Sequence, residues 1–329
     1  MSRVLVIVEH QDRNGVPALS RVSLEALAAG QHLAKQLGIE CSAAVLGEGI
    51  APVIAELSGK QLAKVYAVEH SLLKQYTADG YLHALEQVIR HTNPEFVLFP
   101  HTYQVRDFAP ALATRFQQVL ISDVIAIHEG PAFVRQLFQG KLNADYRPVA
   151  SLPGPCFVSV QAGAFRGEAL EPGTAATESL AIDLTPAQIR TTPSAPFRES
   201  AHTVDLTAAP IIVSVGRGIR EQDNIPLVQA LADALGAELA ASRPICDAGW
   251  LPMERQVGSS GQTVSPKLYL AVGISGAIQH LVGIKGSKTV IAINKDENAP
   301  IFEVADYGVA GDLFEIVPAL TKAILAAKS

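Results

Sequence analysis

Leu268-Tyr-Leu-Ala-Val-Gly-Ile-Ser-Gly-Ala-Ile-Gln-His280, followed by Thr289-Val-Ile-Ala-Ile-Asn294, is the part of the chain that decides the fold. It is typical of an apolar strand, a glycine turn, a helix and a second strand. Gly273 and Gly276 would lead the strand into the helix start, where free backbone N–H groups and the helix dipole suit a phosphate or pyrophosphate. Many α/β proteins have such a turn with nothing bound, so the surrounding residues must show whether this one binds a ligand.

Length and composition favour a two-domain α/β protein. The chain has 329 residues, more than one hydrophobic core usually organises. Hydrophobic residues make up 48% and charged residues 18%, which argues against disorder. The net charge of -6 and the scattered Lys and Arg residues argue against a nucleic-acid partner. Cys41, Cys156 and Cys246 lack the spacing of a zinc site, an iron–sulfur cluster or a disulfide framework.

The start of the chain bears on localisation. Strand-like residues 4–8 follow the first methionine so closely that no room is left for a signal or transit peptide. No apolar run approaches the roughly 18 to 20 residues that a membrane-spanning helix needs. We therefore expect a soluble, cytoplasmic protein that is not embedded in a membrane.

The first half of the chain alternates strand-like and helix-like segments. Strands are predicted at residues 3–9, 41–46, 65–68 and 96–99, and helices at residues 20–37, 50–57, 78–91 and 107–116. This alternation predicts a parallel, doubly wound sheet. From about residue 121 strands follow one another without helices, including 132–138 and 141–148 joined near Gln139-Gly140 like a hairpin, which predicts an antiparallel edge.

The second half repeats the pattern after a break. Residues 171–209 are rich in Pro, Thr, Ser and Ala, so we expect an N-terminal α/β domain over residues 1–200 and a second domain over residues 201–329. Strands are predicted at 211–215, 238–240, 268–272 and 289–294, and helices at 225–235, from 277 and at 313–326. The predicted fold is thus α/β, with two doubly wound parallel-sheet domains.

Polar and glycine residues follow several strands of the predicted second sheet. Ligands of open parallel sheets bind beyond the carboxyl ends of the strands, so these segments should converge on one crevice. The segments are Gly216-Arg-Gly218, Ser242-Arg243, residues 256–261, residues 273–276 and Asn294. Arginines, hydroxyls, an amide and glycine backbone suit an extended ligand with phosphates and polar ring edges, such as a dinucleotide.

Three segments resemble the C-terminal domain of the electron transfer flavoprotein alpha subunit. They are residues 268–280, 289–296 and 299–313, the last of which contains Pro300-Ile-Phe and Val304-Ala-Asp-Tyr-Gly308. The N-terminal half is similar in layout. The resemblance implies that the second domain binds FAD, that the chain forms a heterodimer with a beta subunit, and that the N-terminal domain packs against this partner. It also implies an electron carrier without substrate turnover of its own, which takes electrons from acyl-CoA or other flavoprotein dehydrogenases and passes them to a quinone-reducing or similar acceptor protein.

The resemblance further implies which residues contact FAD. They are Arg217, Ser242, Arg243, Gln256, Val257, Gly258, Ser259, Ser260, Ser275, Gly276, Ala277, Ile278, Gln279, His280, Asn294, Asp312 and Leu313. Ser260 stands where the family often has threonine. Serine keeps the hydroxyl that would meet flavin N5 but lacks the methyl group that fixes the rotamer of threonine.

Arg243 and His280 are expected to stabilise the negative charge that reduction places on the N1 and C2=O side of a flavin. A unit charge about 4 Å from the ring contributes about 4 kcal/mol in the Coulomb term at an effective dielectric of about 20.

Other interpretations stay open at this point. Asp312 precedes a helical run and could simply cap it. Ser275 lies in a segment close to the nucleophile motif of serine hydrolases, but Ala277 replaces the second glycine and His280 is about 140° around the helix. Arg106-Asp107 is expected to open a helix rather than bind an anion. The alternative function is an NAD-binding or NAD-consuming enzyme in which Ser275 or His280 is catalytic.

Overall fold

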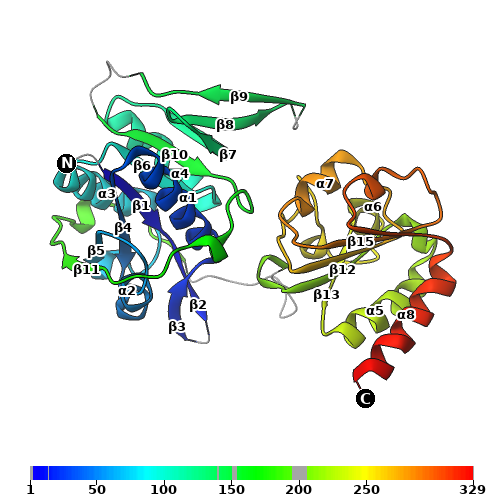
Figure 1. Ribbon diagram of the computed structural model, residues 1–329. Coiled ribbons are helices and arrows are strands. Elements are labelled where there is room, and N and C mark those ends of the chain that lie inside the picture. The colour runs from blue at the N-terminus through cyan, green and yellow to red at the C-terminus, as the bar shows by residue number, and fades with distance from the viewer. Residues whose placement is uncertain (1–2, 14, 139–140, 150–153, 195–205, 329) are drawn as a thin grey trace. The chain divides into compact units, whose positions relative to one another are not determined.

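The chain divides into two compact units, Met1–Pro196 and Phe197–Ser329. A computed structural model describes residues 3–13, 15–138, 141–149, 154–194 and 206–328 (Figure 1). The predicted boundary at residue 200 and the predicted hairpin turn at Gln139-Gly140 lie outside these residues. Each unit is therefore described by itself.

The described part of the N-terminal unit contains a nine-stranded sheet in the order β11-β5-β4-β1-β6-β10-β7-β8-β9. The strands are β1 (Arg3–Val8), β4 (Glu40–Gly47), β5 (Lys64–Glu69), β6 (Phe96–Pro100), β7 (Leu120–His128), β8 (Ala132–Leu137), β9 (Leu142–Tyr146), β10 (Cys156–Val160) and β11 (Ala176–Ser179). The order from β11 to β7 is parallel, whereas β7, β8 and β9 pair antiparallel. The predicted antiparallel edge is thus confirmed.

Four strands of this unit were not predicted. They are β10, β11 and a separate antiparallel hairpin of β2 (His10–Arg13) and β3 (Val16–Leu19). β10 lies between β6 and β7 and pairs parallel with both. The parallel part of the sheet therefore includes β7 and β10, although these strands belong to the segment from residue 120 onward where strands follow one another without helices.

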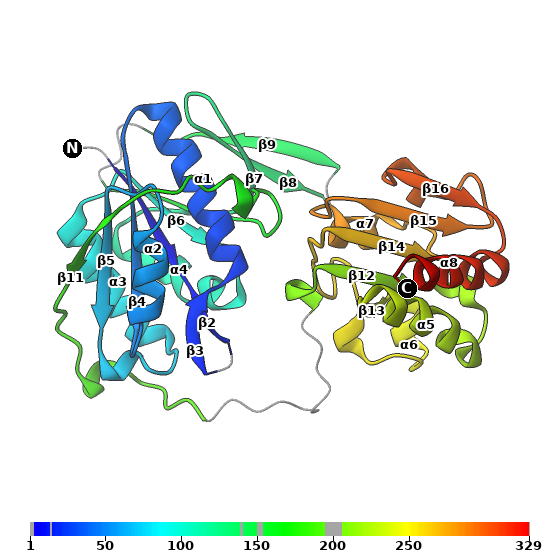
Figure 2. The same ribbon diagram turned by 60° about the horizontal axis from the view of Figure 1, so that its bottom comes forward.

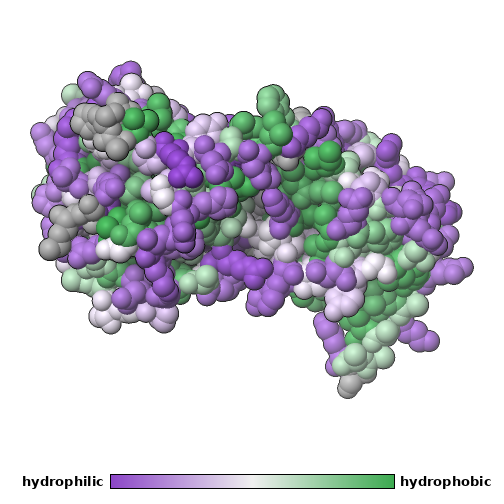
Figure 3. Space-filling view, turned by 45° about the horizontal axis from the view of Figure 1, so that its top comes forward, coloured by the Kyte–Doolittle hydropathy of each residue, from purple (hydrophilic) through white to green (hydrophobic). Residues whose placement is uncertain are grey.

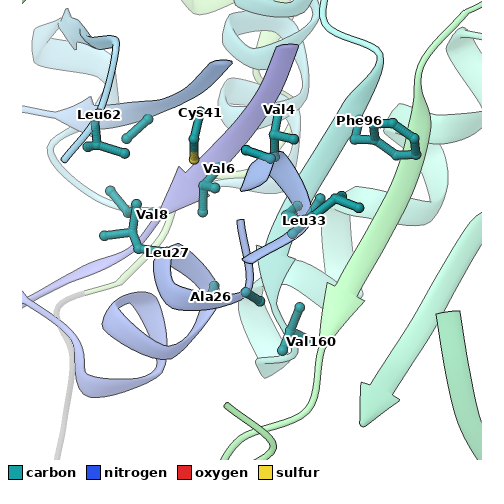
Figure 4. Close-up of a cluster of buried hydrophobic side chains, with 14 of the residues drawn as sticks. Val4, Val6, Val8, Ala26, Leu27, Leu33, Cys41, Leu62, Phe96 and Val160 are labelled. Carbon is teal, nitrogen blue, oxygen red and sulfur yellow. The ribbon is translucent and has the colours of Figure 1, made fainter. Parts of the chain in front are cut away.

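Helices cover the sheet on both faces. They are α1 (Arg21–Leu37), α2 (Ala51–Ser58), α3 (Ala78–Thr92) and α4 (Tyr103–Arg115). Ser20 caps the start of α1 with its side chain, and Gly38 ends the helix with a φ of 65°. On one face, Leu27 and Leu33 of α1 lie in a buried cluster with Val4 and Val6 of β1 (Figure 4).

α4 begins earlier than predicted. Thr102 caps this helix because its hydroxyl accepts a hydrogen bond from Val105 N at 3.1 Å. Arg106 and Asp107 therefore lie within the helix and do not open it, so the predicted helix start at these two residues is wrong.

The C-terminal unit contains a parallel five-stranded sheet in its described part, in the order β13-β12-β14-β15-β16 (Figure 2). The strands are β12 (Ile211–Val215), β13 (Glu238–Ala241), β14 (Leu268–Val272), β15 (Val290–Asn294) and β16 (Tyr307–Ala310). The helices are α5 (Ile225–Leu235), α6 (Arg243–Asp247), α7 (Ile278–Ile284) and α8 (Leu313–Lys328). β16 and α6 were not predicted.

The two faces of this sheet have separate buried clusters. α5 and α8 pack against one face through Leu231, Val317 and their neighbours. Tyr269 and Ile284 belong to the cluster on the other face. Toward its C-terminal end α8 keeps apolar surface exposed (Figure 3). Leu325 in this part of the helix is 54% exposed.

The glycine turn after β14 differs from the prediction in one respect. α7 begins at Ile278, and residues 273–277 form an irregular loop between the strand and the helix. Gly276 in this loop has a φ of 85°, and a Cβ atom there would overlap the backbone of Ile301, 2.7 Å from its Cα. The loop can therefore reach its position only with glycine at residue 276.

Replacing Gly276 with alanine should destabilise the C-terminal unit by about 3 kcal/mol, because it adds a backbone clash to the cost of a positive φ. Gly236→Ala is the matched control, since Gly236 has a φ of 67° with no atom within 4 Å of an added Cβ. That variant should lose only about 1 kcal/mol. Urea unfolding of both variants measures the difference, and equal losses would contradict the role of the contact with Ile301.

Candidate functional site

The loops that follow β12, β13, β14 and β15 line one cavity in the C-terminal unit. Its volume is about 660 Å³, which lies in the range of roughly 300–1,000 Å³ typical of small-molecule sites. The cavity lies at the carboxyl ends of a parallel sheet, as the sequence predicted. The predicted residues that line it are Arg217, Ser242, Arg243, Gln256, Val257, Gly258, Ser260, Ser275, Ala277, Gln279, His280 and Asn294.

The five other predicted residues do not line the cavity. Ser259 N donates to Gln279 O at 2.7 Å, and Gly276 packs against Ile301. Ile278 is 53% exposed, and Leu313, the first residue of α8, is buried in the core. Asp312 caps α8, because its Oδ1 accepts a hydrogen bond from Phe314 N at 2.9 Å.

Seven lining residues were missed by the sequence analysis. They are Arg220, Pro244, Asp247, Lys295, Asp296, Ala299 and Pro300. Lys295 and Asp296 directly follow β15, so the rule that found Asn294 would also have found them. Arg220 and Asp247 carried no comparable signal, because each lies several residues beyond the strand that precedes it.

Close backbone contacts hold the loops in place. Gly218 N donates to Gly273 O at 3.0 Å, and a Cβ atom on Gly218 would lie 2.7 Å from the Cα of Gly273. Asn294 Nδ2 donates to Ile274 O at 2.8 Å, which ties the end of β15 to the loop after β14. The loop of residues 256–261 lies beside the end of β13, where Val257 N donates a hydrogen bond to Ala241 O at 2.9 Å.

Two buried side chains beside the cavity have unused hydrogen-bonding capacity. Gln256 is 1% exposed, and its Nε2 donates to Ser260 Oγ at 2.9 Å. His280 is 6% exposed, and its Nε2 lies 2.9 Å from the Tyr269 hydroxyl. Within the described residues, Gln256 Oε1 and His280 Nδ1 make no hydrogen bond. Each such buried group costs about 1–3 kcal/mol, so polar atoms of a bound ligand would be stabilised here.

The two groups expected to stabilise charge on a reduced ring differ in their protonation. Burial lowers the pKa of His280 to about 4, so the imidazole is neutral at pH 7 and acts only through hydrogen bonds. Arg243 is the cation of the two, and its Nε lies 3.2 Å from Asp247 Oδ2. The Arg243 side chain is 65% exposed, so solvent and Asp247 reduce its electrostatic effect well below the unscreened Coulomb value.

The cavity lining carries a surplus of positive charge. Its cations are Arg217, Arg220, Arg243 and Lys295, and its carboxylates are Asp247 and Asp296. Four positive and two negative charges leave two positive charges, which matches the charge of a ligand diphosphate. The residues present therefore fit FAD.

The geometry argues against the serine hydrolase interpretation. The described hydrogen bond of the His280 side chain joins its Nε2 to the Tyr269 hydroxyl and does not involve Ser275. Ser275 contributes its backbone carbonyl, which accepts a hydrogen bond from Ile301 N at 3.1 Å. Ser275 thus lacks the adjacent base that a nucleophilic serine needs.

The parallel sheet and the polar cavity at its carboxyl ends define a dinucleotide-binding α/β protein. Two family models match the chain, the Electron transfer flavoprotein domain over residues 4–185 and the Electron transfer flavoprotein FAD-binding domain over residues 205–285. The chain belongs to the electron transfer flavoprotein alpha subunit family, and it carries that family's FAD-binding domain. The alternative of an NAD-consuming enzyme is not favoured.

Relatives match over nearly the whole chain. Electron transfer flavoprotein subunit alpha of Bacillus subtilis (strain 168) is 39% identical over 321 residues and covers 96% of both chains. The protein of that name from Mycobacterium tuberculosis (strain ATCC 25618 / H37Rv) is 40% identical over 332 residues and covers 100% of both. The one from Pseudomonas aeruginosa is 38% identical over 330 residues, 98% of this chain and 99% of that protein. None of the helices in the described part of the chain is long and apolar enough to span a bilayer.

The low pKa of His280 predicts a pH dependence of stability. Unfolding returns the pKa from about 4 to its ordinary 6.5, so the unfolded chain binds an extra proton between these pH values. Stability therefore falls as the pH drops from 6.5 to 4, by about 3 kcal/mol from this residue. Urea unfolding at pH 7.0 and 4.5 should show a smaller difference for His280→Gln than for the wild type. His128→Gln, at an exposed histidine, should keep the wild-type difference, and an unchanged pH dependence in His280→Gln would contradict the assignment.

Proposed function

We propose that this chain is the alpha subunit of a heterodimeric electron carrier and holds FAD in the cavity of its C-terminal unit. The observation that supports this most is the cavity itself, whose lining residues carry a surplus of two positive charges and include Gln256 and His280, each with an unpaired buried polar atom. Bound FAD would supply the group that accepts and releases electrons. The residues of this chain would bind that group, orient it and set its potential.

Each site residue has a role in FAD binding that follows from its chemistry. Arg217 and Lys295 would balance the diphosphate charge, and Arg243 would stabilise negative charge on the reduced ring. Ser260 Oγ accepts a hydrogen bond from Gln256 Nε2, so its own hydroxyl proton is free to point to a ligand. Gln256 thereby fixes the Ser260 hydroxyl, a task that the methyl group of threonine performs through the rotamer. His280 would contribute a neutral hydrogen bond.

We further propose that the N-terminal unit packs against an electron transfer flavoprotein beta subunit. The relatives are named as alpha subunits, which supports a partner of this kind. Flavoprotein dehydrogenases, including acyl-CoA dehydrogenases, would deliver electrons, and a quinone-reducing or similar protein would accept them. In this proposal the chain turns over no substrate of its own.

Co-expression with the beta subunit tests the proposal. The purified complex should be yellow, with one FAD per alpha chain by absorbance after denaturation, and should elute as a heterodimer in size-exclusion chromatography. A colourless preparation that binds NAD instead would rule out the proposed function.

Arg243→Ala should lower the two-electron midpoint potential of the bound flavin by about 30 mV, equivalent to about 1.4 kcal/mol, because a cation near the reduced ring is lost. Asp247→Asn is the matched variant, since it removes the carboxylate that pairs with Arg243. That change should raise the potential. Spectroelectrochemical titration measures both, and shifts of the same sign would contradict the assigned role of Arg243.

A further inference from the structure

Arg220 has a strained backbone at the edge of the cavity. Its φ is 71° and its ψ is -53°. Glu221 N donates to Ile219 O across it at 2.9 Å. These values describe a γ-turn of the classical, rare type, which glycine adopts far more readily than arginine. Strain of this kind is usually kept where a side chain must be held in one place.

The Arg220 side chain is held by the first turn of α8. Its Nη2 lies 3.3 Å from Asp312 Oδ2, and its Cζ lies 4.7 Å from the centre of the Phe314 ring. Asp312 is itself fixed, because its other carboxylate oxygen caps α8. The Arg220 side chain is 59% exposed, and an exposed ion pair of this kind contributes little net stability. The contacts with Asp312 and Phe314 therefore orient the guanidinium, but they are too weak to offset the cost of the strained turn.

Most of the hydrogen-bonding capacity of Arg220 stays available. A guanidinium has five N–H donors in a planar fork, which suits phosphate oxygens, and Asp312 engages only one of its nitrogens. Arg217 lies three residues earlier in the same loop and lines the same cavity. The loop after β12 therefore contributes two arginines to the lining of the ligand site.

We propose that Arg220 is a phosphate-binding residue of this cavity, held by the strained turn, Asp312 and Phe314 in position to contact the diphosphate of the dinucleotide. This inference rests on the proposed function, because it takes the ligand to be FAD. It adds a residue that the family resemblance did not indicate. It also gives Asp312, which does not line the cavity, an indirect role as a positioning residue.

ADP is a suitable probe, because it carries the diphosphate and adenosine without the flavin. Arg220→Gly removes the guanidinium and relieves the turn, so Tm should rise by about 3 °C while the Kd for ADP rises about tenfold. The Kd for FAD should rise by the same factor. Arg220→Lys keeps a charge but not the fork and should weaken ADP less. Lys322→Gln removes one exposed charge of the same unit away from the cavity and should leave both affinities unchanged.

Calorimetric titration of the flavin-free complex with the beta subunit measures these affinities, and a thermal melt measures Tm. A gain in stability together with a loss of ADP affinity is a result that a purely structural role for Arg220 does not produce. Wild-type ADP affinity in Arg220→Gly would overturn the inference while leaving the proposed function intact, and so would a loss of FAD affinity without a loss for ADP. If the wild-type complex with the beta subunit bound neither FAD nor ADP, the proposed function itself would fail.

Discussion

The contact between two glycine loops is the constraint on which the cavity depends. The loop after β12 lies so close to the loop after β14 that a Cβ atom on Gly218 would be 2.7 Å from the Cα of Gly273. This approach brings the polar residues of both loops to the same end of the sheet. The loop after β14 is anchored on its other side, where Gly276 lies against the backbone of Ile301. A side chain at these positions would push the loops apart and widen the space between them.

Within this space the charge is distributed unevenly. Burial keeps the His280 imidazole neutral, so it can only donate or accept hydrogen bonds. The cations are arginine and lysine side chains nearer to solvent, and Asp247 limits the field of Arg243. A ligand with an anionic diphosphate and a polar ring system would meet positive charge at its exposed parts and uncharged hydrogen-bonding groups where it is buried. FAD has this distribution.

Much of the C-terminal unit could be predicted because its strands are short apolar runs between helical segments. β12, α5 and β14 have the predicted bounds. β16 was missed because its residues are all exposed and follow no apolar pattern. β10 was missed for another reason: the strand is apolar, but its position between β6 and β7 depends on contacts distant in sequence. Arg220 was missed as a site residue for the same reason as β10, since its strained turn and its contact with α8 depend on the three-dimensional structure.

The claim that the cavity of the C-terminal unit is completed by FAD is tested most directly by a crystal structure of the flavin-loaded protein. The account predicts FAD in this cavity, with a polar atom of the ligand within hydrogen-bonding distance of Gln256 Oε1, which is now buried without a partner among the described residues. FAD bound elsewhere, or bound in the cavity with Gln256 Oε1 still unpaired, would contradict it.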